Sequence, residues 1–325
     1  MSDVQTSPPR LAPEPLPDDI SSAQPGGGCC YSIELAWGHV RRWWLRTFRS
    51  GHVARMAATR RGDPTGCPHP VLDPRDLKFF RNRCTAHWLD DDDPFQWRDR
   101  LPVTRWGLAE LLIMGTPMVV LAVALVATGW WYLAVAPAVV LGWLVWFFRD
   151  PQRAVPQEAG LVVSPADGVV AEVTPLEFDE FIGGPAVRIG IFLSIFNVHL
   201  NRAPERLRVI RLRYTPGKFL NALNPASAWE NEAMWIGFEA CDAPHRRMIV
   251  RQIAGLFARR IVCNLRPGQE CQRGEKFGMI KLGSRTELIV PAGNESFGNL
   301  IVVPTVGEVV KAGSTVLARY TKAES

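Results

Sequence analysis

Three polar side chains stand in otherwise apolar parts of the sequence, and their types suit nucleophilic chemistry. Asp167 lies in the turn SPADG, His199 in the run FNVHLNR, and Ser284 directly follows Gly283. A histidine can take the proton from a serine hydroxyl, and a carboxylate can orient that histidine. Each residue also has an ordinary explanation, because Asp-Gly and Gly-Ser are common turn pairs and a single strand histidine is usually a core residue. A nucleophilic site follows only if the fold brings the three together.

The composition restricts the class of protein that must position them. The chain has 325 residues, 47% of them hydrophobic, with a formal net charge of +5 and no long Lys/Arg run. This favours a membrane surface or a small anionic substrate over nucleic acid. Seven cysteines without a regular framework indicate reduced thiols that face the cytosol. The first residues lack the basic start and apolar stretch of a cleavable signal peptide, so none is expected.

The N-terminal third divides into a tail and a basic extension. Residues 1–30 are rich in Pro, Ser and Gly, which predicts a disordered tail. Residues 31–105 form a charged, partly helical extension in which an aromatic and apolar stripe recurs at helical spacing among arginines: Trp37, Val40, Trp44 and Phe48. Such a helix suits the interface of an anionic bilayer, or it is a solvated basic helix packed on its own domain.

Two Cys/His pairs in the same extension raise the question of a metal. Cys67 with His69, and Cys84 with His87, supply four side chains that zinc accepts in a tetrahedral site. The spacing matches no common zinc finger, and ordinary packed or exposed side chains explain the residues equally simply. We therefore expect no metal.

Residues 106–148 carry the strongest physical signal in the sequence. The stretches 107–128 and 130–148 are almost wholly apolar, and each is long enough to cross about 30 Å of hydrocarbon as a helix. Arg105 and Arg149 bracket the pair, so the positive-inside tendency places both ends in the cytoplasm. We expect a transmembrane hairpin; a buried helical hairpin in a soluble core is the alternative.

Residues 149–325 have the pattern of a separate, mainly β domain. Short β-type runs are broken by Gly, Pro and Asn, which predicts mostly antiparallel strands with one or two helices. The most helix-like piece lies around residues 252–261. The expected architecture is a mainly β (α+β) catalytic domain, tethered on the cytoplasmic face of the cell membrane.

An ordered set of motifs over residues 143–320 resembles the short form of phosphatidylserine decarboxylase, a pyruvoyl-dependent membrane enzyme. The pieces are WFFRDP, SPADGVV, FLSIFNVHLNRAP, YTPGKFLNA, QIAGLFARRIVC, GMIKLGSRTELIVP and VGEVVKAGSTVLA. SPADG and the Gly-rich C-terminal turn also occur in biotinyl and lipoyl carriers, which adds barrel-sandwich-like elements to the expected fold. The first 100 residues fall outside the resemblance.

The resemblance implies that the chain cleaves itself between Gly283 and Ser284. The Ser284 hydroxyl would attack the Gly283 carbonyl, and elimination and hydrolysis would leave a pyruvoyl group on a fragment beginning at residue 284. His199 would act as the base, and Asp167 would hold its imidazole in the right tautomer. The self-derived pyruvoyl group would be the only cofactor. Through a Schiff base it would convert phosphatidylserine to phosphatidylethanolamine and CO₂, with His199 also a candidate proton donor.

The resemblance also implies substrate contacts, and the chain departs from the family pattern in two places. Lys218 and Arg202 could meet the lipid phosphate or carboxylate, and Phe219 and Met279 could line a pocket, although surface exposure, ion pairing or core packing explains each as well. Long-form members carry two histidines where this chain has only His199. The short-form pattern Glu-Asn-Glu-Arg-Asn here reads ENEAM, residues 230–234, so contacts attributed to that Arg and Asn are in doubt.

Two other classes of protein fit parts of the pattern. A membrane-anchored serine hydrolase would use Asp167, His199 and an intact Ser284, but the chain lacks a G-x-S-x-G elbow. A carrier module would need a modifiable lysine between methionines at a hairpin tip, and the sequence has none. The partners expected for the decarboxylase are phosphatidylserine in the membrane, the two fragments of the chain itself, and a further copy in a homo-oligomer; no nucleic acid is expected.

Overall fold

The computed structural model describes residues 10–15, 28–63, 86–222, 224, 226–256, 260–281, 283–293 and 298–321. The chain forms two compact units, one of residues 21–151 and one of residues 152–325 together with 1–20. Cys67, His69 and Cys84 of the proposed zinc set lie outside the described residues. No group of three or more potential metal ligands occurs within the described part of the chain.

The first unit begins with the predicted basic helix, but as two segments. Helix α1 spans Gly28–Phe48 and α2 spans Ser50–Thr59, with a break at Arg49, whose φ of −135° is not helical. The aromatic stripe is solvent-exposed within this unit, with Trp37 63% and Phe48 64% accessible. Short 3₁₀ turns follow at Asp90–Asp92, Gln96–Arg100 and Arg105–Gly107.

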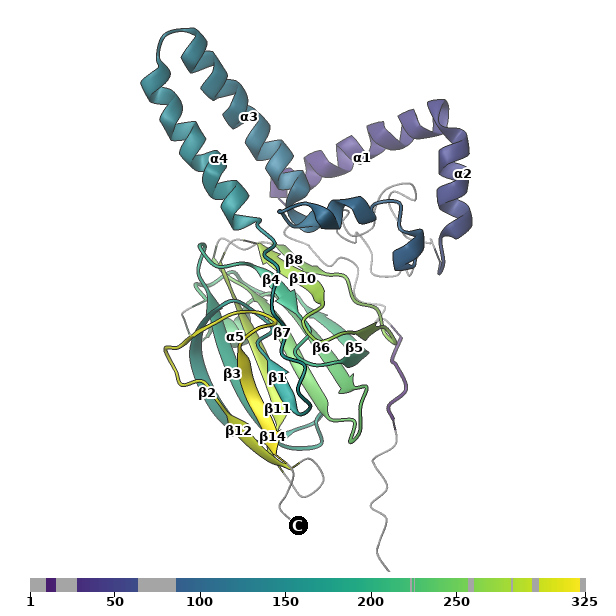
Figure 1. Cartoon of the computed structure of the whole chain (residues 1–325), viewed down its shortest axis with the longest axis vertical. Helices are drawn as coiled ribbons and strands as arrows, with labels where there is room; N and C mark the ends of the chain where they lie inside the picture. Colours follow the sequence, from purple (N-terminus) through teal and green to yellow (C-terminus); the bar gives the residue numbers. More distant parts are fainter. Residues whose placement is uncertain are drawn as a thin grey trace, which may run out of the picture. The chain divides into compact units, whose positions relative to one another are not determined.

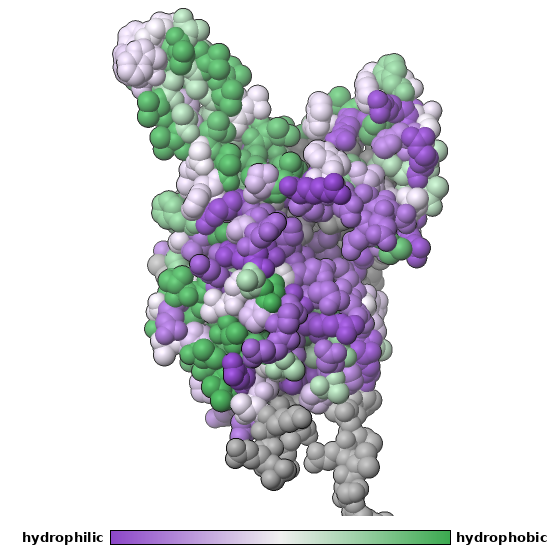
Figure 2. Space-filling model, viewed as in Figure 1, coloured by the Kyte–Doolittle hydropathy of each residue, from purple (hydrophilic) through white to green (hydrophobic). Residues whose placement is uncertain are grey.

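An apolar helical hairpin completes this unit. Helix α3 spans Leu108–Ala127, and a 3₁₀ turn at Trp131–Ala134 leads into α4, Val135–Phe147. Figure 2 shows that the surface of this hairpin is mostly hydrophobic. The segment Arg105–Ala127 is long and apolar enough to cross a membrane, whereas Trp131–Phe147 is shorter. The prediction of two helices is confirmed, but the second is shorter than expected because its first four residues form the 3₁₀ turn.

The second unit is mainly β, as predicted (Figure 1). Its largest sheet has eight antiparallel strands in the order β13-β2-β3-β11-β7-β6-β5-β9, and two three-stranded sheets have the orders β1-β14-β12 and β4-β10-β8. The strands are β1 Leu161–Val163, β2 Gly168–Asp179, β3 Gly184–Leu193, β4 Leu200–Arg202, β5 Leu207–Thr215, β6 Ala233–Ala240, β7 Arg247–Ala254, β8 Arg260–Cys263, β9 Glu270–Cys271, β10 Lys276–Lys281, β11 Ser284–Pro291, β12 Asn299–Val302, β13 Val309–Val310 and β14 Val316–Thr321. A single turn of helix, α5, spans Ser227–Glu230.

The hydrophobic core lies on one face of the eight-stranded sheet. Alternate residues of its central strands, among them Leu193, Ala254 and Leu288, join one buried cluster with side chains from the two smaller sheets. We call this the inner face. Burial of these apolar side chains is the main stabilising term of the unit, at roughly 25 cal/mol per Å² removed from water.

Two predictions about local structure are wrong. The described residues of 252–261 are not helical: Gln252, Ile253 and Ala254 end strand β7, and Arg260 begins β8. Part of the tail expected to be disordered is ordered, because the Glu14 amide donates a hydrogen bond to the Ile210 carbonyl on β5. Residues 10–15 therefore lie against a part of β5 that the short strand β9, paired with it only at Leu207 and Arg208, does not cover.

Candidate active site

Ser284 is the first residue of β11, at the centre of the eight-stranded sheet. It pairs with Leu193 on β3 and with Ala254 on β7. Its side chain is fully buried, and its hydroxyl oxygen has no hydrogen-bond partner among the described residues. A buried hydroxyl without a partner is energetically unfavourable and is therefore a candidate functional group.

Gly283 precedes this serine in a backbone conformation that favours glycine. Its φ is +73°, in the left-handed region that L side chains adopt at a cost of roughly 1–2 kcal/mol. Gly255 packs directly on the same peptide, since a β-carbon added there would lie 2.4 Å from the Gly283 carbonyl oxygen. The two glycines allow the turn between β10 and β11 to form and leave the Gly283 carbonyl close to neighbouring backbone.

His199 contacts Gly283 from the loop before β4. Its Nε2 atom accepts a hydrogen bond from the Gly283 amide at 3.1 Å, and its Nδ1 atom lies 2.9 Å from the Asn197 carbonyl oxygen. A carbonyl can only accept, so Nδ1 carries the ring hydrogen and Nε2 presents its lone pair to residue 283. These contacts fit a neutral, fully buried ring whose Nε2 atom faces Gly283, the residue on the N-terminal side of the Gly283–Ser284 bond.

Asp167 makes contacts different from the one predicted. One of its oxygens accepts from Arg153 at 2.6 Å, and the other accepts from the Ala312 amide at 2.8 Å. These bonds join the SPADG turn to the segment after α4 and to the C-terminal turn. In the described contacts, the Asn197 carbonyl rather than Asp167 fixes the tautomer of His199. A catalytic role for Asp167 stays a prediction.

The four residues proposed for substrate binding lie in different environments. Lys218 is exposed and pairs with Glu230 at 2.7 Å, a hydrogen bond that raises the pKa of the lysine. Arg202 is buried on β4 and donates to the Gly274 carbonyl at 3.0 Å. Met279 is fully buried on β10, and Phe219 packs against the main core cluster. None of the four lines the cavity beside the Gly283 peptide described next.

An apolar cavity of about 240 Å³ opens beside the Gly283–Ser284 peptide. Its lining residues come from the end of β3, the loop before α5, the end of β7 and the turn before β11: Phe192, Leu193, Ser194, Ile195, Asn221, Ala222, Gly255, Leu256 and Gly283. The exposed side chains of Phe196 and Leu256, 63% and 51% accessible, add apolar surface at these loops. The space suits part of an apolar ligand next to the reactive peptide.

Asn231 fixes one wall of this cavity. Its side chain accepts from the Leu220 amide at 2.8 Å and donates to the carbonyls of Leu220 and Ala254 at 2.9 and 2.7 Å. Leu220 adjoins Asn221 and Ala222 of the lining, and Ala254 adjoins Gly255. One buried amide therefore joins the loop wall to the strand that packs on Gly283.

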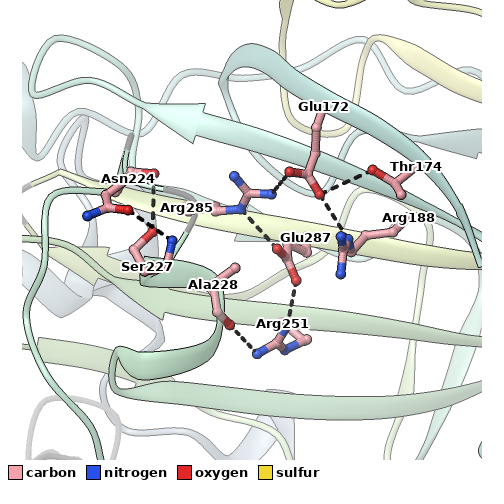
Figure 3. Close-up of polar contacts among 11 residues, drawn as sticks. Glu172, Thr174, Arg188, Asn224, Ser227, Ala228, Arg251, Arg285 and Glu287 are labelled. Carbon is pink, nitrogen blue, oxygen red and sulfur yellow. Dashed lines mark hydrogen bonds and ion pairs between the residues drawn. The ribbon is translucent and has the colours of Figure 1, made fainter.

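The opposite, outer face of the sheet carries a buried charge network (Figure 3). Glu287 accepts from Arg251 at 2.7 Å and from Arg285 at 2.9 Å, and Arg285 also pairs with Glu172 at 2.9 Å. Glu287 is fully buried, so the two arginines compensate a charge that would be costly to bury alone. Because residues alternate along a strand, these outward side chains confirm that Ser284 and Thr286 face inward.

Sequence reasoning missed Asn197, Gly255 and Asn231 as site residues. Asn197 acts through its backbone carbonyl, which no side-chain pattern reveals. Gly255 could have been found from the sequence, because it is a glycine that interrupts an apolar run. Asn231 lies in the ENEAM motif, at a position that matches the family pattern.

Comparison with known proteins identifies the class to which this site belongs. A family model described as phosphatidylserine decarboxylase matches residues 140–318. A phosphatidylserine decarboxylase proenzyme of Rhodopirellula baltica is 53% identical over 244 residues, which cover 75% of this chain and 99% of that protein. Proteins with the same description from Symbiobacterium thermophilum and Syntrophus aciditrophicus are 44% and 37% identical, covering 62% and 70% of this chain and 90% and 99% of the relatives.

These matches extend over most of the β unit and include both His199 and the Gly283–Ser284 peptide. The chain therefore belongs to the phosphatidylserine decarboxylase family, and it is a carboxy-lyase.

Proposed function

We propose that this chain converts phosphatidylserine to phosphatidylethanolamine and CO₂, using a pyruvoyl group that it makes by cleaving itself between Gly283 and Ser284. One observation carries the proposal: His199 Nε2 contacts Gly283, and the buried, unpartnered hydroxyl belongs to Ser284, so the candidate base meets one residue of the bond to be cleaved and the nucleophile is on the other. The proenzyme names of the relatives support processing of the chain.

The cleavage uses atoms whose positions the fold fixes. His199 accepts the hydroxyl proton while Ser284 Oγ attacks the Gly283 carbonyl carbon, so the peptide becomes an ester and the Ser284 nitrogen becomes a free amine. Loss of the Ser284 α-proton expels the Gly283 carboxylate, and water then releases ammonia to leave the pyruvoyl group. Serine is required because the same oxygen is first nucleophile and then leaving group.

The residues around position 284 fit such a group. The unpartnered hydroxyl marks an atom that processing removes, and the neighbouring cavity gives space for a ligand beside the new terminus. When present, the pyruvoyl carbonyl supplies an electron sink for the pair released with CO₂. Ala254 and Leu193, which pair with Ser284 on either side, would exclude water from that position.

We further propose that the α3–α4 hairpin inserts into the cell membrane and that the β unit acts from the cytoplasmic face. The support is the apolar surface of the hairpin and the arginines at its two ends, Arg105 and Arg149. Phosphatidylserine in that membrane would be the substrate, and residues 1–283 and 284–325 would stay associated as two fragments of one fold. A second copy in a homo-oligomer remains a proposed partner.

The experiment is a decarboxylation assay on purified protein with phosphatidylserine labelled in its carboxyl group. Wild type should release labelled CO₂ and lose activity after borohydride reduction in the presence of substrate, whereas Ser284→Ala should release none. Borohydride should leave the lipid as an adduct on the fragment that begins at residue 284. Release of labelled CO₂ by an uncleaved chain would contradict the pyruvoyl mechanism.

A further inference from the structure

Glu232 is a buried acid that the chemistry above does not use. It lies between α5 and β6, is only 1% exposed, and its Oε1 atom has no hydrogen-bond partner among the described residues. Most buried carboxyl oxygens in proteins are hydrogen-bonded or ion-paired, so an unpartnered one suggests a role beyond packing.

The strand register places Glu232 in the same row as Ser284. The Ala254 amide donates to the Glu232 carbonyl at 2.9 Å, and Ala254 in turn pairs with Ser284. Neighbouring strands lie about 4.8 Å apart, so the α-carbons of residues 232 and 284 are separated by about 10 Å. Only the methyl group of Ala254 lies between them in this row.

The side chains of this row share the inner face. Ala254 and, two positions beyond Glu232, Met234 belong to the core cluster, and Glu232 lies beside Tyr214, which packs on that cluster. Thr286 shows which residues of β11 face inward, because its hydroxyl accepts a hydrogen bond from Asn201 at 3.0 Å. Glu232 and Ser284 therefore project to the same side of the sheet, with a small side chain between them.

The surroundings favour the protonated form of this acid. Burial raises the pKa of Glu232 to about 7, and the neighbouring Tyr214 hydroxyl only partly offsets the effect. Lys218, in the adjacent turn, is exposed and pairs with Glu230. Arg251, on β7, pairs with Glu287 on the outer face of the sheet. His199 contacts Gly283, and the contacts of its two ring nitrogens fit the neutral form. No cation among these groups is positioned to hold Glu232 ionised.

We propose that Glu232 is the acid that delivers the proton replacing CO₂ on the product carbon. The inference rests on the proposed function. The carbon–carboxyl bond breaks, its electron pair passes to the group at residue 284, and the carboxyl proton of Glu232 forms the new C–H bond. Water then reprotonates Glu232, so each turnover takes up one proton from solvent. A glutamate side chain spans about half of the 10 Å between the two α-carbons, and a substrate joined at residue 284 covers most of the rest.

The geometry disfavours His199 as the donor in this state. Its Nδ1–H points to the Asn197 carbonyl, and its Nε2 accepts a hydrogen bond from Gly283, so the atom nearest the site carries no proton. His199 is thus arranged to receive a proton during cleavage, and Glu232 to give one during decarboxylation.

The test compares wild type with Glu232→Gln, which keeps the shape and neutrality of the protonated acid but cannot donate its proton. Self-cleavage should proceed, KM should change little, and kcat should fall about 10²- to 10⁴-fold, as general-acid removal does. A second readout is the intact mass of the fragment 284–325 after incubation with substrate. Without the proper donor, protonation on the chain's own carbon leaves the substrate nitrogen there as an N-terminal alanine and releases the lipid as an aldehyde.

A matched control is Glu205→Gln. Glu205 is another buried carboxyl, paired with Arg246 at 2.8 Å. Arg246 stacks on Tyr320, whose hydroxyl bonds to Pro291 at the opposite end of β11. This variant should keep wild-type kcat and form no alanine. A Glu232→Gln enzyme with wild-type turnover and no alanine would overturn the proposal.

If Glu232→Gln does not fold, Tyr214→Phe provides a second test of the role of Glu232. Removing the hydroxyl that lowers the pKa of Glu232 should move the alkaline limb of the kcat profile to higher pH. An unmoved limb would contradict the assignment. If wild type itself shows neither cleavage nor decarboxylation, the proposed function fails instead.

Discussion

The Gly283 amide donates a hydrogen bond to Nε2 of His199 across 3.1 Å, which joins two residues 84 positions apart in the sequence. This contact places a ring nitrogen beside Gly283, whose carbonyl carbon the proposed reaction attacks. The imidazole is held by backbone on both sides, by an amide at Nε2 and a carbonyl at Nδ1. The base is thus pre-oriented before any substrate is present.

His199→Ala should leave the chain uncut or slow to cut, because the Ser284 hydroxyl loses its proton acceptor. We expect self-cleavage to slow by about 10²- to 10⁴-fold. A gel time course after synthesis measures this, with circular dichroism to verify folding. His52→Ala, a half-buried histidine in α2, is the control and should cleave as wild type does. Equal cleavage rates in all three proteins would exclude His199 as the base.

Gly283→Ala should impair cleavage through backbone strain rather than through a clash. A β-carbon at this position would have its nearest neighbour at 3.9 Å, but the φ of +73° costs a non-glycine residue about 1–2 kcal/mol. Denaturant unfolding should show that loss, and cleavage should slow. Gly184→Ala is the matched control, since Gly184 has free space around it and no left-handed φ. If the two alanine variants behave alike, the backbone argument is incorrect.

Asn231→Ala should loosen the wall of the cavity beside Gly283. Three buried hydrogen bonds are lost, which we expect to lower the free energy of unfolding by about 2–4 kcal/mol. Because the loop that contributes Asn221 and Ala222 is no longer fixed, KM for the lipid should rise more than kcat falls. Asn299→Ala, at an exposed site on β12, should change neither quantity. An unaltered KM in the Asn231 variant would show that this wall does not contact substrate.

Stability should fall as pH rises through the range in which Glu232 titrates differently in the folded and unfolded chains. The folded pKa is raised from 4.5 to about 7, so between these values the folded state binds more protons than the unfolded state. By linkage, the free energy of unfolding decreases over that interval, by up to about 3 kcal/mol. Urea unfolding from pH 4 to pH 8 should show this decline in wild type and a smaller one in Glu232→Gln. Parallel curves would mean that Glu232 ionises normally in the folded protein.

The sequence was sufficient to predict the helical hairpin and the mainly β unit, and the family resemblance predicted that His199 meets Gly283. The sequence pattern does not predict the strand at residues 247–254 along its whole length, because polar side chains are buried on both of its faces. Arg251 pairs outward with Glu287 and Gln252 bonds inward to Asn201, so the alternation typical of a strand is lost.

Long-range and backbone interactions account for the remaining differences. The segment 10–15 has the composition of a disordered tail, yet the Leu11 amide donates to Glu239 at 2.7 Å and the Leu11 carbonyl accepts from Arg208. No local pattern predicts a partner more than 190 residues away. The tautomer of His199 likewise depends on the Asn197 backbone carbonyl, which no side-chain pattern in the sequence reveals.

The most direct test is the intact mass of the purified protein after denaturation, compared with Ser284→Ala. Wild type should give two chains, residues 1–283 and a fragment beginning at position 284 that is lighter than its serine form by one ammonia. Ser284→Ala should give one chain of full length. A wild-type protein that remains a single 36.2 kDa chain while it decarboxylates phosphatidylserine would contradict the account.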